Sequence, residues 1–394
     1  KQAVLLLAVA VGMNQIQGRA TVYFSLPFVL FSAWGGWLAD RFAKKRVVIA
    51  VKLLELVAML IGAFGILTMN WFCVLTMVFL MGLQSALFNP ALNGSIPELY
   101  PEAYVTKANA LLKLVTTVGV LLGIALAGFS LDQHWFPTQV IFGMEVPFGR
   151  VLVAAAVVLV GLLGMIASFG VFSRPASGAH HSFPWTGPFD SLRDLIRLQD
   201  DPLLLLAIFG DCFFYFISLL VVLVINTLGL QQLALNNSET SMLSVAMMVG
   251  VCIGSLLAAG LTDQKRWTHV LMPGAVGMGI SLCVVGLLVS SAGAAAPFPA
   301  VLTLFVLTGL FGGLFLIPVT SFIQIRPEAQ SKGRVIGADN FASFSCMLLA
   351  GQIFPLIDRS LQPAQSMLVL GVIALLAGGV IWFVLRTPLF RSAA

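Results

Sequence analysis

The stretch GWLADRFAKKRVVIAVKLLELVAMLIGAFGIL, residues 36–67, decides how this chain folds. It opens with a cluster of charged residues and continues as an apolar run at 47–67. That run matches the roughly 20 residues that an α-helix needs to cross the hydrocarbon core of a bilayer. Lys52 and Glu55, three residues apart, are its only charges. Because a charge in hydrocarbon is costly unless it faces a partner or water, both residues are candidates for function.

The whole chain has the composition of a membrane protein. Hydrophobic residues make up 59% of its 394 residues and charged residues only 9%, whereas about 25% charged residues is usual in soluble domains. Apolar runs of spanning length predict an all-α membrane protein with twelve transmembrane helices. The first run is too short to cross a bilayer, and the chain begins with Lys1, so we expect a truncated first helix. The predicted spans are 1–13, 21–39, 47–67, 71–88, 104–130, 151–172, 202–225, 241–260, 270–290, 299–318, 335–356 and 367–385.

A polar stretch divides these spans into two groups of six. It contains an amphipathic segment, for which we predict a short interfacial helix. The side chains predicted to face the bilayer are Leu192, Leu195, Ile196 and Leu198. The predicted parts are an N-terminal half at 1–172, a cytoplasmic linker at 173–201 and a C-terminal half at 202–394.

The basic residues predict the orientation. With the loop at 41–46 in the cytoplasm, most of the 21 Lys and Arg residues lie on the cytoplasmic side, and only Arg19, Arg150 and Arg359 lie outside. We therefore expect both termini in the cytoplasm. The net charge of +5 follows from this topology and gives no indication of nucleic-acid binding. The five cysteines lie in apolar spans without a close pair, which predicts neither disulfides nor a metal site.

Two patterns resemble the major facilitator superfamily. The triplet Pro-Glu-Ala follows both the fourth and the tenth span, and parallel repeats are typical of these transporters. Residues 36–46 resemble the family's cytoplasmic Gly-x-x-x-Asp-Arg signature. In it we expect Gly36 to permit close helix approach, while Asp40, Arg41 and Lys44 bridge helix ends and hold one face closed. The alternative is positive-inside charge beside a packing glycine.

A closer resemblance covers essentially the whole chain. Segments in both halves are similar to the bacterial lysophospholipid transporter branch of that superfamily, namely 26–46, 88–99, 107–110, 313–318 and 337–340. The resemblance implies a flippase in the bacterial inner membrane, which moves lysophospholipids such as lysophosphatidylethanolamine from the outer to the inner leaflet by alternating access of the two halves. It also implies reacylation by a fused or associated acyltransferase and acyl-ACP synthetase. Lys113 departs from the branch, whose members carry an acidic residue there.

The charged residues within spans are the predicted substrate site. A lysophospholipid requires a cation for its phosphate and an acceptor for its amine. Lys52 and Glu55, at i and i+3 on one helix face, could hold the head group or only each other. Lys113, on the same predicted helix as Asn109, could bind a phosphate oxygen or pair with Glu55. Asp211 could accept a proton, a sodium ion or the substrate amine, or neutralise Lys113.

Other polar residues are weaker candidates. Five could line a polar cavity, namely Asn14, Gln84, Asn89, Asp339 and Asn340. The alternative for the amides is a hydrogen bond between helices, and for Asp339 and Asn340 a helix-end cap with a salt bridge to Arg334. The glycine pairs Gly119 with Gly123 and Gly250 with Gly254 predict close helix packing.

Two other functions compete with lipid transport. An ion-coupled exporter of drugs or small metabolites would have the same fold and the same buried charges. A membrane acyltransferase is disfavoured, because no histidine has an aspartate five residues later and the chain lacks Gly-x-Ser-x-Gly and Walker-type loops. We therefore predict a transporter without catalytic residues, cofactor or metal, driven by a sodium or proton gradient or by metabolic trapping of its product.

Overall fold

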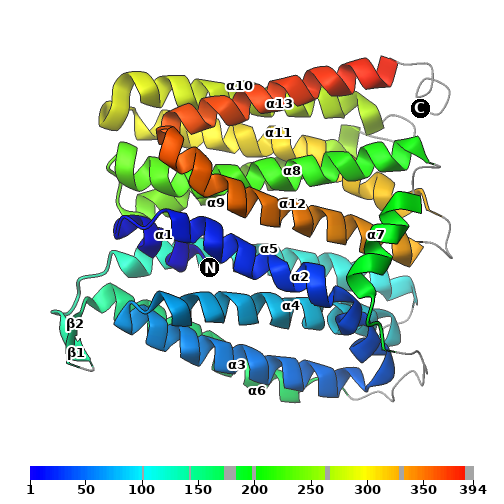
Figure 1. The fold of residues 1–394 in the computed structure, drawn as a ribbon, viewed down its shortest axis with the longest axis horizontal. Coiled ribbons are helices and arrows are strands. Elements are labelled where there is room, and N and C mark those ends of the chain that lie inside the picture. Colours follow the sequence, from blue (N-terminus) through cyan, green and yellow to red (C-terminus); the bar gives the residue numbers. More distant parts are fainter. Residues whose placement is uncertain are drawn as a thin grey trace. The chain divides into compact units, whose positions relative to one another are not determined.

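The computed structural model describes residues 1–99, 102–141, 143–172, 183–197, 201–261, 267–327 and 332–386. Each predicted span coincides with a helix, which confirms an all-α membrane fold (Figure 1). Ten helical segments in the described residues are long and apolar enough to cross a membrane. The predicted number of twelve transmembrane helices is not confirmed. Helix α1 has only nine residues, and in α5 only residues 115–131 form an apolar helix, which is shorter than a full span. The helices are α1 (Gln2–Ala10), α2 (Gln15–Arg41), α3 (Lys44–Thr68), α4 (Trp71–Leu99), α5 (Glu102–Leu131), α6 (Phe148–Phe169), α7 (Gly187–Arg197), α8 (Pro202–Thr227), α9 (Asn237–Leu261), α10 (Leu271–Ala292), α11 (Phe298–Ile325), α12 (Lys332–Ser360) and α13 (Pro363–Arg386).

The chain separates into two compact units. Unit 1 comprises Lys1–Val4 and Arg19–Asp190, and unit 2 comprises Leu5–Gly18 and Ser191–Ala394. In unit 1, α3 packs against α4 and α6. In unit 2, α9 packs against α11, α10 against α13 and α11, and α8 against α12 and α11. The end of α1 and the start of α2 therefore belong with the second unit, which the spacing of the apolar runs does not indicate.

The helix ends in unit 2 are fixed by side chains. Asp201 caps α8 by accepting a hydrogen bond from the Leu204 N–H at 3.2 Å, and its other carboxylate oxygen pairs with Arg326 Nε at 2.9 Å. At the start of α9, Asn236 and Glu239 each accept a hydrogen bond from the other's backbone N–H. Such reciprocal bonds satisfy the N–H groups that a helix leaves unpaired in its first turn.

The segment between α5 and α6 contains a small hairpin that we did not predict. Strand β1 (Gln139–Ile141) pairs antiparallel with β2 (Met144–Val146). Gly143 has a positive φ of 75° in the turn, a conformation that glycine adopts without steric cost.

Helix α7 confirms the short helix predicted in the linker, but one predicted orientation is wrong. Leu192 and Ile196 are exposed, as expected for a face that contacts lipid. Leu195 instead packs against the apolar core of unit 2, which α8, α10, α11 and α12 supply. Leu198 lies outside the described residues. Three apolar side chains at helical spacing therefore do not share one environment here.

Glycines set the closest helix contact of unit 2. A Cβ at Gly250 or Gly254 of α9 would meet backbone atoms of Val306 or Leu310 in α11. Gly309 and Gly313 of α11 face the α9 backbone in the same way. The packing predicted for Gly250 with Gly254 is confirmed. The prediction for Gly119 with Gly123 is wrong for the described residues, because a Cβ at either position would meet nothing within 4 Å.

We expect Gly254→Ala to lower the unfolding temperature of the purified protein in detergent, followed by tryptophan fluorescence. Its new methyl group would clash with backbone, and overpacking costs about 1–3 kcal/mol. Gly260→Ala on the same helix is the matched control, since its Cβ meets nothing within 4 Å. It should be neutral or stabilising by up to about 1 kcal/mol. Equal behaviour of the two variants would contradict the proposed close contact.

Candidate functional site

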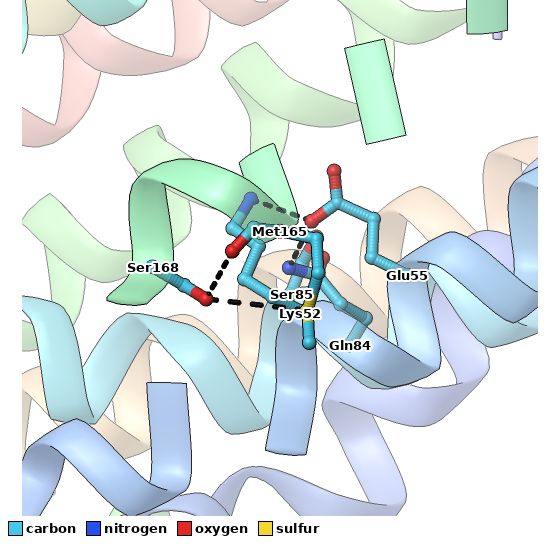
Figure 2. A network of polar contacts seen from close by, with 6 residues as sticks. All are labelled: Lys52, Glu55, Gln84, Ser85, Met165 and Ser168. Carbon is cyan, nitrogen blue, oxygen red and sulfur yellow. Dashed lines mark hydrogen bonds and ion pairs between the residues drawn. The ribbon is translucent and has the colours of Figure 1, made fainter. Parts of the chain in front are cut away.

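Three polar side chains meet inside unit 1, where α3 faces α4 (Figure 2). Lys52 Nζ lies 2.6 Å from Glu55 Oε2, and Gln84 Nε2 donates a hydrogen bond to the same oxygen at 2.9 Å. Ser85 Oγ donates to Gln84 Oε1 at 3.1 Å and fixes the orientation of the amide. The side chains of Lys52 and Glu55 are 21% and 13% exposed. Both charges are therefore largely removed from the surface and compensate each other.

The surroundings of Lys52 keep its ammonium inside the unit. The Nζ atom lies 5.1 Å from the ring centroid of Phe88, within the range of a cation–π interaction. Gly164 of α6 lies beside the lysine, since a Cβ there would be 3.4 Å from Nζ, an ordinary van der Waals distance. The side chain of Lys52 therefore lies between α4 and α6. Its ammonium group does not extend to an end of α3.

This cluster can recognise a zwitterion. Glu55 receives both donors on Oε2, while Oε1 has no hydrogen-bond partner among the described residues. An incoming phosphate would compete for the ammonium of Lys52, and an incoming amine would find the carboxylate of Glu55. The predicted pairing of Lys52 with Glu55 is present. The predicted pairing of Lys113 with Glu55 is not tested, because the side chains of Lys113 and Asn109 lie outside the described residues.

A second polar cluster lies inside unit 2, on α8, α11 and α12. Asp211 is buried, with 3% exposure. Its Oδ2 accepts a hydrogen bond from Ser343 Oγ at 2.8 Å, and Thr320 Oγ1 lies 3.4 Å from its Oδ1. Asp339 is also buried, and its Oδ1 has no hydrogen-bond partner in the described part of the chain. It lies one turn before Ser343 on α12, and its charge would repel that of Asp211.

The structure corrects the helix-end cap that was the alternative for Asp339. The alternative salt bridge to Arg334 is not tested, because the side chain of Arg334 lies outside the described residues. A cap occupies the residue before a helix or its first turn, whereas Asp339 lies about two turns into α12, which begins at Lys332. Asn340, the next residue, is exposed. Sequence reasoning did not identify Ser343 or Thr320. Ser343 lies four residues after Asp339, and residues at that spacing share a helix face. This spacing was a signal by which the sequence could have indicated Ser343.

The predicted gating motif shows a different packing glycine. A Cβ at Gly36 would meet nothing within 4 Å, whereas one at Gly35 would meet the backbone of α4 at Ala86 and Leu87. The close approach predicted for Gly36 therefore belongs to Gly35. Arg41 is exposed and stacks 5.3 Å from the ring centroid of Trp37, one turn earlier. Lys44 is the first residue of α3. The side chain of Asp40 lies outside the described residues, so the gating role stays a prediction.

The remaining predicted cavity residues lie elsewhere. Asn14 and Gln231 form a reciprocal amide pair at 2.9 and 3.1 Å, and Asn14 also donates to Asp358 at 3.3 Å. Next to it, Arg359 donates to Gln15 at 3.1 Å. This network joins residues 14–15 to the turn at 228–232 that follows α8 and to the end of α12, all within unit 2. It favours the alternative of hydrogen bonds between helical segments. Asn89 is exposed.

We expect Lys52→Met to lower the unfolding temperature, because Glu55 would keep a buried charge with only Gln84 as donor. The cost should be about 1–3 kcal/mol, below that of a fully buried pair since both side chains are partly exposed. The double variant Lys52→Met with Glu55→Gln should recover most of this loss. Thermal unfolding of both variants tests it. Equal destabilisation by the single and the double variant would show that the pair is not coupled.

Comparisons with known proteins agree with this architecture. The profile of the Major Facilitator Superfamily matches residues 4–351. The lysophospholipid transporter LplT of Klebsiella pneumoniae subsp. pneumoniae is 26% identical over 90% of this chain and 83% of its own length. That of Cronobacter sakazakii is 27% identical over 83% of this chain and 76% of its own length.

Solved structures confirm the fold. A POT family transporter in complex with 5-aminolevulinic acid has a TM-score of 0.74 at 14% identity, covering 97% of this chain and 91% of that protein. The inward-open xylose transporter XylE of E. coli has a TM-score of 0.68 at 14% identity, covering 94% and 86%. The resemblance seen in the sequence is therefore confirmed: this chain belongs to the Major Facilitator Superfamily, and it is a multi-pass membrane transporter rather than an enzyme.

Proposed function

We propose that this protein transports lysophospholipids across the bilayer. Support comes from relatives named lysophospholipid transporter, whose similarity extends over most of this chain. One structural observation carries the proposal. Lys52 and Glu55, a cation and an anion on one helix face, form an ion pair inside unit 1. A head group such as phosphoethanolamine has one negative and one positive group, so the pair matches both of its charges.

The empty site would be neutral because its two charges satisfy each other. Binding exchanges this internal ion pair for two ion pairs with the substrate, the phosphate on Lys52 and the amine on Glu55. Gln84 keeps Glu55 in place during the exchange, because its hydrogen bond to Oε2 does not depend on the lysine. Such an exchange avoids leaving an uncompensated charge in a poorly hydrated site.

We expect the transport cycle to use the alternating access that is typical of the family's fold. Alternation between outward- and inward-facing states would carry the head group from the outer to the inner leaflet of a bacterial inner membrane, while the acyl chain stays in an apolar environment. Reacylation by an acyltransferase with an acyl-ACP synthetase, fused or associated, would then trap the lipid inside. Lys113, Asn109 and Asp211 stay predicted as further head-group contacts, and Asp40, Arg41 and Lys44 as gating residues.

Uptake of labelled lysophosphatidylethanolamine into proteoliposomes tests the proposal. The double variant Lys52→Met with Glu55→Gln, which should remain folded, is expected to lose about tenfold or more of the uptake rate. A hydrogen bond to a charged group contributes about 1.5–3 kcal/mol, which corresponds to a factor of ten or more. Asp194→Asn, which changes an acid of α7, is the control and should transport normally.

Two results would contradict the proposal in different ways. If the double variant takes up lysophospholipid as fast as the wild type, these residues do not bind the head group. If the wild type takes up none of several lysophospholipids but exchanges drugs or metabolites for ions, the protein is an exporter.

A further inference from the structure

The short helix α7 has an exposed apolar face outside the candidate membrane spans. Phe189, Leu192 and Ile196 are exposed, the first of them by 73%. Trp185, two residues before the helix, is 81% exposed. We propose that this face docks on anionic phospholipid at the surface of the bilayer. Docking of this kind does not depend on the identity of the transported cargo.

Packing contacts fix which face of α7 is exposed. At the start of the helix, Gly187 is buried against α2, because a Cβ there would lie 2.5 Å from the Cβ of Ala33. Near the end, Leu195 packs against the apolar core of unit 2. With about 100° between successive residues, Ile196 lies about 180° from Gly187 and about 100° from Leu195 around the helix. The apolar face therefore points away from both packing contacts.

Aromatic rings hold the segment before α7 in place. The ring centroid of Phe183 lies 5.1 Å from that of Trp34 and 5.1 Å from that of Trp37, both on α2. It lies 4.6 Å from the ring centroid of Trp185. Aromatic pairs at such distances stabilise a contact beyond the area that they bury. The start of α7 is therefore attached to α2, and its exposed face has a defined orientation.

The charged residues of α7 are sorted around its apolar face. Arg193 lies about 60° from Ile196 and Arg197 about 100°, whereas Asp190 and Asp194 lie about 120° and 160° away. Asp194 contacts Arg197 at 3.7 Å, and Arg193 makes no ion pair in the part of the chain that the structure describes. The charge next to the apolar face is thus positive and available to a partner.

This pattern matches an anionic bilayer surface. In an interfacial helix the apolar side chains enter the boundary between head groups and acyl chains, while arginines at its edge reach the phosphate groups. Each basic residue near an anionic membrane surface strengthens binding by about fivefold. The acids of α7 lie farther from the apolar face than the arginines, which reduces their repulsion of such a surface.

The chain itself brings α7 close to the bilayer. The apolar helix α8 begins at Pro202, five residues after α7 ends at Arg197, and it belongs to a candidate membrane span. Five residues reach at most about 18 Å, so the end of α7 lies within that distance of the start of the span. A lipid surface is therefore within reach of the face, and this favours lipid over a soluble protein as its partner.

Docking would also connect the lipid composition to transport. Helix α7 joins the two units, because unit 1 ends at Asp190 and unit 2 continues from Ser191. A movement between the units would have to shift or bend this helix. Its attachment to lipid would therefore affect the rate of such a movement, a consequence that rests on the proposed function.

The depth of α7 in the bilayer tests docking without any substrate. A nitroxide is attached through Leu192→Cys to the full chain in nanodiscs, and its contact with oxygen, which concentrates in lipid, is compared with that of a water-soluble nickel complex. With phosphatidylglycerol in the nanodisc, oxygen should reach the label more readily than nickel. Phosphatidylcholine alone, or Arg193→Gln with Arg197→Gln, should shift this equilibrium towards water, by up to about fivefold for each arginine.

Controls separate this effect from general changes. A label at Asp190→Cys should stay in contact with water, and the labelled wild type gives the background of the five native cysteines. Arg386→Gln removes an arginine that stacks on Trp382 of α13, and it should leave the depth of residue 192 unchanged. A label at residue 192 that nickel reaches in both lipids would overturn docking on lipid. Equal depth in both lipids and in the double arginine variant would overturn the preference for anionic lipid.

Uptake measurements test the consequence for transport. Uptake of labelled lysophosphatidylethanolamine by the wild type should depend on the phosphatidylglycerol content of the proteoliposomes. The double variant Arg193→Gln with Arg197→Gln should lose this dependence and keep the wild-type rate in phosphatidylcholine alone. A wild type whose uptake ignores phosphatidylglycerol would overturn the connection to transport. Absence of uptake by a wild type whose α7 still docks would instead overturn the proposed cargo and leave the docking surface standing.

Discussion

The structure depends on the cost of placing a charge where water is scarce. Each ionisable side chain inside an apolar helix must either become neutral or, if it is charged, contact a polar partner or water. Lys52 satisfies this requirement within its own helix, through Glu55 at i+3, and α4 adds Gln84 as a second donor. Asp211 satisfies it through hydroxyl groups of two other helices. The helices of each unit are therefore held in register by polar contacts as well as by apolar packing.

Close helix contact is the second requirement, and glycine provides it. Apolar side chains give little preference for helix association over lipid, so contact between helices depends on packing quality. Unit 2 satisfies this with Gly250 and Gly254 against Gly309 and Gly313. In unit 1 comparable contacts are those of Gly35 with the α4 backbone and of Gly82 with the α2 backbone. Contacts between bare backbones permit small sliding movements without a change of side-chain rotamer, which suits a protein that must alternate between states.

The sequence predicted the helices well because span length and apolar composition follow directly from the bilayer. It also predicted the pair of Lys52 with Glu55, since i and i+3 lie on one helix face. The i, i+4 spacing places Ser343 on the face of Asp339, but the sequence could not show that Ser343 donates to Asp211 or that Gln84 is the partner of Glu55. Contacts between helices depend on rotation and register, which a local pattern does not specify. The prediction that Gly36, and not Gly35, packs against another helix was wrong for the same reason. Adjacent residues on a helix point about 100° apart, so a motif locates a glycine without showing which helix it faces.

The two clusters differ in their balance of charge, and this difference separates their roles. Lys52 and Glu55 form a neutral pair in which each member can exchange its partner for a group of a zwitterionic substrate. The cluster around Asp211 instead contains hydroxyl donors, Ser343 and Thr320, and no cation among the described residues, so it does not offer a partner for a phosphate group. A carrier that moves a zwitterion gains no energy from the membrane potential through its cargo.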